Sequence, residues 1–106
     1  MEEVERPQDN QMPTVYIGKK NMSFYINVCV KLFEKGYKKL IIEGLGENVR
    51  KAVDVANFLK IFYKNEVIKI DNVYIDLIEG ESIRGLPRKV SMIRISVSID
   101  EGGNKT

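Results

Sequence analysis

The chain has 106 residues, of which 43% are hydrophobic and 30% are charged, and it contains one cysteine and no histidine. This length suits one small domain, and a single cysteine excludes a disulfide framework. Without histidine, neither a cysteine–histidine zinc site nor a histidine general base can be assembled. We therefore expect a protein that is not an enzyme and that binds no metal or cofactor.

The sequence contains no membrane or secretion signal that we can identify. No apolar run approaches the ~18 residues of a membrane span, and the acidic start lacks the basic region of a secretory signal peptide. A lone cysteine fits a reducing compartment. We expect an intracellular protein of the cytoplasm or the nucleus, with no membrane partner.

The formal net charge of +2 hides an uneven distribution. Residues 1–13 carry a net charge of −3 and residues 100–106 carry −1, whereas residues 14–99 hold fifteen basic and nine acidic side chains. A basic body favours a polyanionic partner, although charges that only keep the protein in solution give the same balance. We expect one domain over residues 14–99, between a disordered acidic arm (1–13) and a flexible tail (100–106).

The first half of the domain has the pattern of a strand, a helix and a strand. Residues 14–17 are β-branched or aromatic, which predicts a short strand. Over residues 22–33, apolar residues recur at helical spacing. Cys29 lies on this apolar stripe, so we expect it to pack in the core. Residues 39–43 form a short apolar run that predicts a second strand.

The second half predicts a helix and two strands. The apolar face of the helix over residues 49–63 is wider than a surface helix needs, which indicates either a partner subunit or packing within the chain. Residues 68–77 alternate in polarity and change phase near positions 71–72, which predicts a β-bulge in one long strand. Residues 90–99 form the last strand, and residues 79–89 form a long hairpin tip.

The order of the predicted elements is β-α-β-α-β-β. This order is typical of an α/β domain in which two helices cover one face of a four-stranded sheet. Right-handed crossovers place both helices on the same side of that sheet. No internal repeat or low-complexity tract interrupts the pattern.

A first cluster of positive charge, Lys19 and Lys20, follows the first strand and precedes the first helix. Gly18, the two lysines and the free amide groups of a helix start suit a phosphate oxygen. We count Asn21, at the start of the helix, among the candidate contacts. A lysine pair that is only solvated is the alternative.

A second cluster, Arg50 and Lys51, lies in the first turn of the second helix. Basic residues there oppose the helix macrodipole at a cost of a few tenths of a kcal/mol, which indicates an anion nearby. Glu47 offers a capping carboxylate at the same helix end and can neutralise the two charges. Both explanations stay open.

A third cluster lies at the hairpin tip, where Arg84, Arg88 and Lys89 occur without an intervening acid. A projecting basic arm can lie along a nucleic-acid groove, because arginine binds phosphates with two parallel hydrogen bonds. A solvated loop is the alternative, and Glu79 and Glu81 interrupt the basic surface.

Three segments of the chain, taken in order, resemble the motifs of one family. They are residues 15–20 (VYIGKK), residues 51–56 (KAVDVA) and residues 84–89 (RGLPRK), which run into Ile93-Arg94-Ile95. They are similar to the strand-and-lysine-pair, second-helix and hairpin motifs of the Alba family of small nucleic-acid-binding proteins. The resemblance covers about residues 14–99.

The resemblance implies a two-layer α+β fold with a mixed four-stranded sheet, also found in the C-terminal domain of translation initiation factor three. It implies a homodimer, or a heterodimer with another Alba-family protein, built around the second helix and the last two strands. We assign the dimer interface to Val55, Phe58, Phe62 and Tyr63. Some archaeal members are acetylated at the first lysine of the pair, which corresponds to Lys19.

The sequence also departs from the archaeal members. Leu45 and Glu47 stand where those proteins commonly carry arginines, Asn21 replaces a frequent proline, and Glu43 adds a negative charge beside the expected binding face. These departures argue against chromosome packing of the archaeal kind. The loop before the second helix is closer to eukaryotic relatives, which include RNA-binding Alba proteins and paired subunits of ribonuclease P and MRP.

We predict a dimeric protein that binds the backbone of RNA or DNA without reading its sequence, in RNA regulation or in chromatin. The alternative is a subunit of a ribonucleoprotein such as ribonuclease P or MRP, working as a heterodimer with a relative. A nuclease that uses carboxylates alone is a third hypothesis. The candidate phosphate contacts are the cations of the three clusters and the asparagine at the helix start: Lys19, Lys20, Asn21, Arg50, Lys51, Arg84, Arg88 and Lys89.

Overall fold

The computed structural model describes residues 12–64, 67–81 and 87–100. The elements within these residues are β1 (Thr14–Tyr16), α1 (Met22–Glu34), β2 (Lys39–Leu45), the 3₁₀ turn η1 (Gly46–Asn48), α2 (Val49–Phe62), β3 (Ile68–Glu81) and β4 (Pro87–Ile99). This is the predicted order of helices and strands, with the 3₁₀ turn added before α2. None of the helices in these ranges is long and apolar enough to cross a membrane.

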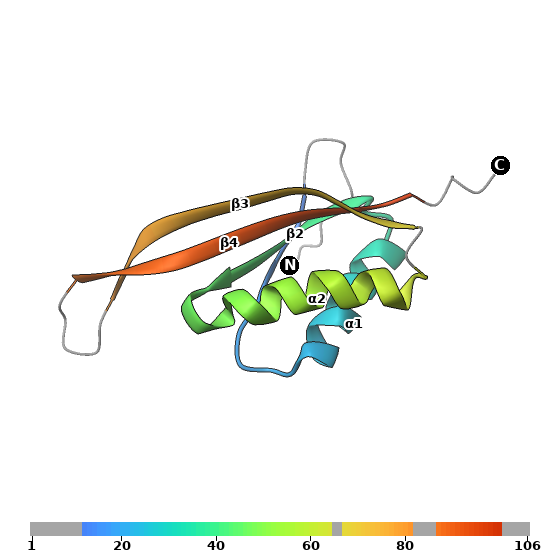
Figure 1. Ribbon diagram of the computed structural model, residues 1–106. Coiled ribbons are helices and arrows are strands. Elements are labelled where there is room, and N and C mark those ends of the chain that lie inside the picture. Colours follow the sequence, from blue (N-terminus) through green and yellow to red (C-terminus); the bar gives the residue numbers. More distant parts are fainter. Residues whose placement is uncertain (1–11, 65–66, 82–86, 101–106) are drawn as a thin grey trace.

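The four strands form one mixed sheet in the order β1-β2-β4-β3. β1 pairs with β2 in parallel, whereas β4 pairs with β2 and β3 antiparallel; a register shift between Ile70 and Asn72 confirms the predicted β-bulge. Both helices lie on the same face of the sheet, below it in Figure 1. Right-handed crossovers explain this placement. The predicted fold class, a two-layer α+β domain with a mixed four-stranded sheet, is confirmed.

The hydrophobic core lies between the two helices and the sheet. Its innermost side chains come from one stripe of each helix and from inward-facing strand positions: Cys29, Leu40, Ile42, Ala52, Val55, Ala56, Leu59 and Val97. The prediction that Cys29 belongs to the core is confirmed. Burial raises the pKa of the Cys29 thiol to about 12, so it stays protonated at neutral pH and is not a nucleophile.

The β3–β4 hairpin is longer than the sequence predicts. We expected residues 79–89 to form a loop, but the structure pairs residues 79–81 with residues 87–89, and the last pair is Glu81 opposite Pro87. The expectation is wrong for these six residues, because pairing between the strands, and not apolar alternation, holds them in the ladder. The rest of the expected loop, residues 82–86, lies outside the described residues. Gly80 allows the strands to approach, since a Cβ at this position would lie 2.5 Å from Cγ2 of Val90.

The start of α2 lies close against the end of β2. A Cβ at Gly44, near the end of β2, would lie 2.5 Å from the carbonyl oxygen of Asn48 and 2.9 Å from Cβ of Ala52. Only glycine leaves room for this approach. Because β1 and β2 are parallel neighbours, the loop after β1 and the first turn of α2 lie at the same edge of the sheet.

The ordered domain extends slightly beyond residues 14–99. The amide of Ile41 donates to the carbonyl of Pro13 at 2.9 Å, and the amide of Asp100 donates to the carbonyl of Val67 at 2.8 Å. Pro13 and Asp100 therefore pair with the domain, although we placed them in the arm (1–13) and the tail (100–106). Residues 1–11 and 101–106 of those segments lie outside the described residues.

Candidate nucleic-acid interface

A short loop carrying two lysines connects β1 to α1. It follows Ile17, whose amide donates to the carbonyl of Glu43 at 2.9 Å and extends the pairing of β1 with β2. Residues 18–20, here called the lysine loop, present Lys19 and Lys20 as exposed side chains. The Nζ of Lys20 lies 5.5 Å from the centre of the Phe24 ring, within the range of a cation–π contact. Two positive charges therefore stand at this edge of the sheet.

Tyr25 of α1 binds the backbone of the lysine loop. Its hydroxyl oxygen accepts hydrogen bonds from the amide of Gly18 at 2.8 Å and from the amide of Lys20 at 3.2 Å. The Tyr25 side chain is buried, which keeps the hydroxyl in place. Tyr25 is not among the predicted site residues, because its position on the apolar stripe of the helix predicts only core packing.

Asn21 begins α1 and caps it. Its Oδ1 accepts a hydrogen bond from the amide of Phe24 at 3.0 Å, and its backbone is extended, as is usual for an N-cap residue. The oxygen of the side chain is therefore committed to the helix. A phosphate contact through the amide group of Asn21 stays a prediction.

Lys51 reaches from the first turn of α2 to the lysine loop. Its Nζ donates to the carbonyl oxygens of Gly18 and Lys20, both at 2.7 Å, and lies 5.8 Å from the centre of the Tyr25 ring. These hydrogen bonds join residues 33 and 31 positions apart in the sequence. The first two predicted clusters of positive charge therefore form one site.

Arg50 extends into solvent from the same turn of α2. Its side chain is 91% exposed, and its Nε lies 3.8 Å from Oδ2 of Asp54, one turn further along the helix. An exposed pair of this kind contributes little to stability. The N-cap residue of α2 is Asn48, and its side chain makes no capping hydrogen bond with the described residues. Glu47 precedes it in the 3₁₀ turn, where its side chain is exposed. Glu47 therefore does not occupy the capping position that we considered for it.

The third cluster lies on the β3–β4 hairpin, which extends past the start of α2 and away from the loop between β1 and α1 (Figure 1). Arg88 is exposed on this arm. The Nζ of Lys89 lies 3.1 Å from Oε2 of Glu79 on the facing strand. Arg84 lies outside the described residues. The structure thus joins the first two clusters, whereas the described residues of the third, Arg88 and Lys89, lie apart from them on the hairpin (Figure 1).

Two acidic side chains of the sheet, Glu43 and Asp76, pair with neighbouring groups. Glu43 accepts a hydrogen bond from Nη1 of Arg94 at 3.0 Å, so its charge is compensated, contrary to the expectation that it opposes the binding face. The hydroxyl of Tyr74 donates to Asp76 at 3.0 Å, and this bond to a carboxylate raises the pKa of Tyr74. Among the residues that the structure describes, no three histidine, cysteine, aspartate or glutamate side chains gather as a metal site.

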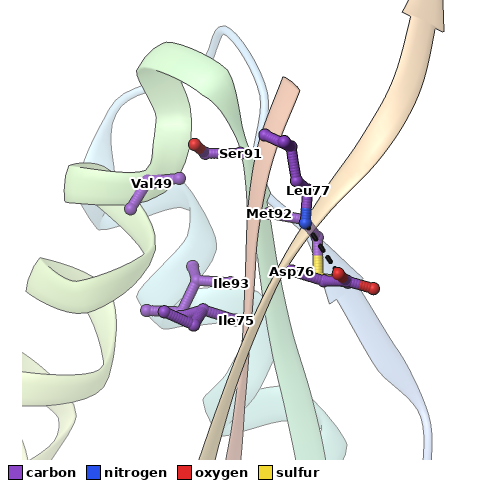
Figure 2. A pocket seen from close by; sticks show the side chains of 7 residues that line it. All are labelled: Val49, Ile75, Asp76, Leu77, Ser91, Met92 and Ile93. Carbon is purple, nitrogen blue, oxygen red and sulfur yellow. Dashed lines mark hydrogen bonds between the residues drawn. The ribbon is translucent and has the colours of Figure 1, made fainter. Parts of the chain in front are cut away.

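Exposed apolar side chains line the outer side of α2 and the edge strand β3. This set, here called the apolar face, consists of Phe58, Ile61, Phe62, Val73, Ile75 and Leu77. Ile75 is the most exposed residue of this set, at 71%. A cavity of about 460 Å³ adjoins this face, between the start of α2 and the hairpin. Figure 2 shows that the side chains of Val49, Ile75 and Ile93 point into it. Large apolar patches on a soluble protein mark interaction sites.

Two of the four predicted interface residues, Phe58 and Phe62, lie on the apolar face. Val55 is 0% exposed within the core, so assigning it to an interface is wrong. The half-buried ring of Tyr63 packs edge-on against Phe33, with 6.1 Å between ring centres. Helical spacing identifies the apolar side of α2 but not which of its residues meet the sheet. The resemblance implies that the last two strands take part in the interface, but no individual residue of β3 is among the four that we assigned, although the alternation of this strand is visible in the sequence.

Comparison with known proteins gives the family. The family model of Alba matches residues 13–77. A DNA/RNA-binding protein Alba from Nanoarchaeum equitans is 32% identical over 87 residues, which cover 81% of this chain and 97% of the relative. Another, from Thermoplasma acidophilum, is 34% identical over 88 residues, which cover 79% of this chain and 92% of the relative. The matched region includes both the lysine loop and α2.

Solved structures share the fold. Alba from Thermoplasma volcanium has a TM-score of 0.74 and 29% identity, over 80% of this chain and 98% of that chain. ALBA1 from Trypanosoma brucei has a TM-score of 0.67 and 20% identity, over 89% of this chain and 75% of that chain, which supports the fold alone. Since the family model spans more than half of the sequence and the relatives align along most of it, this chain belongs to the Alba family.

Proposed function

We propose that this protein binds nucleic acid through the backbone phosphates and catalyses no reaction. The observation that carries the proposal is the junction between Lys51 and the lysine loop, which gathers Lys19 and Lys20 beside the first turn of α2. A pair of exposed ammonium groups on a fixed loop attracts phosphates and releases their counterions. The relatives named DNA/RNA-binding protein Alba support the same function.

In this proposal Lys19 and Lys20 are the central contacts, and Arg50 and Arg88 add exposed charge on α2 and on the hairpin arm. Lys89 contributes less, because Glu79 holds its ammonium group. Phosphate contacts carry no sequence information, so binding is largely independent of sequence. Acetylation of Lys19 removes one central charge and weakens the attraction.

We further propose that the ligand is more often RNA than chromosomal DNA. Leu45 and Glu47 are exposed in the segment that leads into α2, where they add no positive charge beside Lys51. A weaker positive field suits contact with a short stretch of nucleic acid better than continuous coating of a DNA duplex by many copies of the protein. RNA regulation in the cytoplasm or the nucleus follows from this choice of ligand.

A second Alba-type domain covers the apolar face in this proposal. Exposed apolar area costs about 25 cal/mol per Å², and the apolar face combines three side chains of α2 with three of an edge strand. Covering it with a second copy, or with a relative, removes this cost and brings two lysine loops into one particle. A dimer therefore doubles the number of phosphate contacts.

Salt-titrated binding tests the proposed function. We would compare duplex DNA, duplex RNA and single-stranded RNA with the wild-type protein. If one dimer makes ~8 phosphate contacts, log K should fall against log salt with a slope of about −6 to −7. A slope near zero for all three ligands would contradict the proposal.

Ile75→Glu should convert the dimer into monomers. A carboxylate on the apolar face would be buried without a partner, which should raise the dissociation constant of the dimer about 100-fold or more. Sedimentation then gives half the wild-type mass at micromolar concentration. Asn72→Glu, exposed on the same strand, is the matched control and should keep the dimer. An unchanged mass for Ile75→Glu would place the interface elsewhere.

The second candidate is a ribonucleoprotein subunit, such as one of ribonuclease P or MRP, that works as a heterodimer with a relative. The exposure of the apolar face favours it, because a relative with a matching face covers it as well as a copy does. In this case the isolated chain aggregates or leaves RNA unbound, and an Alba-family relative restores binding. A stable homodimer that binds RNA by itself supports the first function.

A further inference from the structure

Lys51 directs its ammonium group toward the protein backbone. The Nζ lies 2.7 Å from the carbonyl oxygens of both Gly18 and Lys20, and 5.8 Å from the centre of the Tyr25 ring. An ammonium group has three donors, so two of them are committed to the lysine loop. The neighbouring Arg50 differs, because 91% of its side chain is exposed.

Tyr25 makes a second set of hydrogen bonds with the backbone of the lysine loop. The amides of Gly18 and Lys20 donate to its hydroxyl oxygen, while the carbonyls of the same two residues accept from Lys51. A Cβ at Gly18 would lie 3.2 Å from that oxygen, which shows how closely the loop packs on Tyr25. Two side chains from two helices therefore bind every backbone polar group of Gly18 and Lys20.

We propose that Lys51 is a positioning residue, which fixes the lysine loop so that Lys19 and Lys20 are presented to phosphates in one arrangement, and that Lys51 does not itself contact phosphate. This inference rests on the proposed function of the lysine loop. It differs from the sequence-based prediction, which counts Lys51 among the phosphate contacts.

A fixed loop strengthens binding because its order does not have to be created when the ligand arrives. Fixing the backbone of a flexible residue costs conformational entropy, and binding that meets a preorganised site avoids this cost.

The anchoring contacts also offset the repulsion among three neighbouring ammonium groups. Carbonyl oxygens and the Tyr25 ring face the charge of Lys51, and the Phe24 ring faces that of Lys20.

Two substitutions of Lys51 separate positioning from phosphate contact. Lys51→Met keeps most of the stem and removes the ammonium group. Lys51→Arg keeps the charge but carries it on a larger, planar guanidinium. This group does not fit between two carbonyl oxygens that both accept from one ammonium nitrogen. Lys60→Met, near the other end of α2, is the matched control, and Lys20→Met is the reference for a direct contact.

We expect Lys51→Met to speed the hydrogen exchange of the Gly18 and Lys20 amides about tenfold in the free protein, because the loop loses an anchor. Lys60→Met should leave these rates unchanged. Both Lys51 variants should bind RNA about tenfold more weakly while the salt slope changes by less than about 0.5, because the number of phosphate contacts stays the same. Circular dichroism confirms that each variant folds.

The opposite pattern would overturn the inference: unchanged exchange rates, wild-type affinity for Lys51→Arg, and a slope reduced in Lys51→Met as much as in Lys20→Met. Each lysine that contacts phosphate contributes about 0.7 to 0.9 to the slope, so a direct contact is measurable. Failure of the proposed function itself looks different, because the wild type then shows no salt-dependent binding. In that case Lys51 could still fix the lysine loop, as the exchange rates would show, but the loop would not serve phosphate binding.

Discussion

Replacing Lys19 and Lys20 together by alanine should weaken binding to duplex DNA, duplex RNA and single-stranded RNA by about two to three orders of magnitude at 0.1 M salt. The proposed dimer loses four ammonium groups, and since each contact contributes about 0.7 to 0.9 to the salt slope, the slope should fall by roughly three. The lysine loop itself should persist, because Tyr25 and Lys51 hold its backbone and not its side chains.

The matched control for this variant is Lys31→Ala/Lys35→Ala. It removes the same charge near the C-terminal end of α1, about 20 Å from the lysine loop at 1.5 Å per residue. Fluorescence anisotropy with labelled ligands should show affinities close to wild type. An equal loss in the control would mean that net charge governs binding. A loss confined to one of the three ligands would show that the loop reads more than phosphates.

Most of the fold could be predicted because each element carries its own periodicity. The alternation over residues 68–77 even shows the phase change that the structure places as a bulge between Ile70 and Asn72. The extension of the hairpin could not be predicted in this way. Glu79 and Lys89 stabilise that pairing across the two strands, and a cross-strand contact leaves no local apolar pattern.

The charged residues of the candidate site could be predicted, but their connections could not. Adjacent lysines and a basic first helical turn are visible in the sequence. Whether Lys51 turns toward solvent or toward the lysine loop depends on carbonyls 33 and 31 positions earlier, which only the parallel pairing of β1 and β2 brings near. The role of Tyr25 could not be predicted for a related reason. Its ring fits the apolar stripe of the helix, which indicates only core packing, while its hydroxyl binds the lysine loop.

Gly44→Ala should lower the free energy of unfolding by about 3 kcal/mol, because a methyl group there overfills the contact between β2 and α2. The added Cβ would lie 2.5 Å from the carbonyl oxygen of Asn48 and 2.9 Å from Cβ of Ala52. A main-chain carbonyl cannot rotate away as a side chain can, so α2 has to shift. Urea unfolding followed by circular dichroism should show a midpoint lowered by about 1 to 3 M.

The same shift of α2 should reach the lysine loop, because Lys51 belongs to the turn that moves. Its hydrogen bonds to Gly18 and Lys20 are both 2.7 Å long, so a small displacement lengthens them and should speed exchange of the loop amides in the folded variant. Gly18→Ala is the stability control, since its Cβ would meet only the Tyr25 hydroxyl, at 3.2 Å, and should destabilise less. A wild-type unfolding midpoint for Gly44→Ala would show that α2 does not approach β2 this closely.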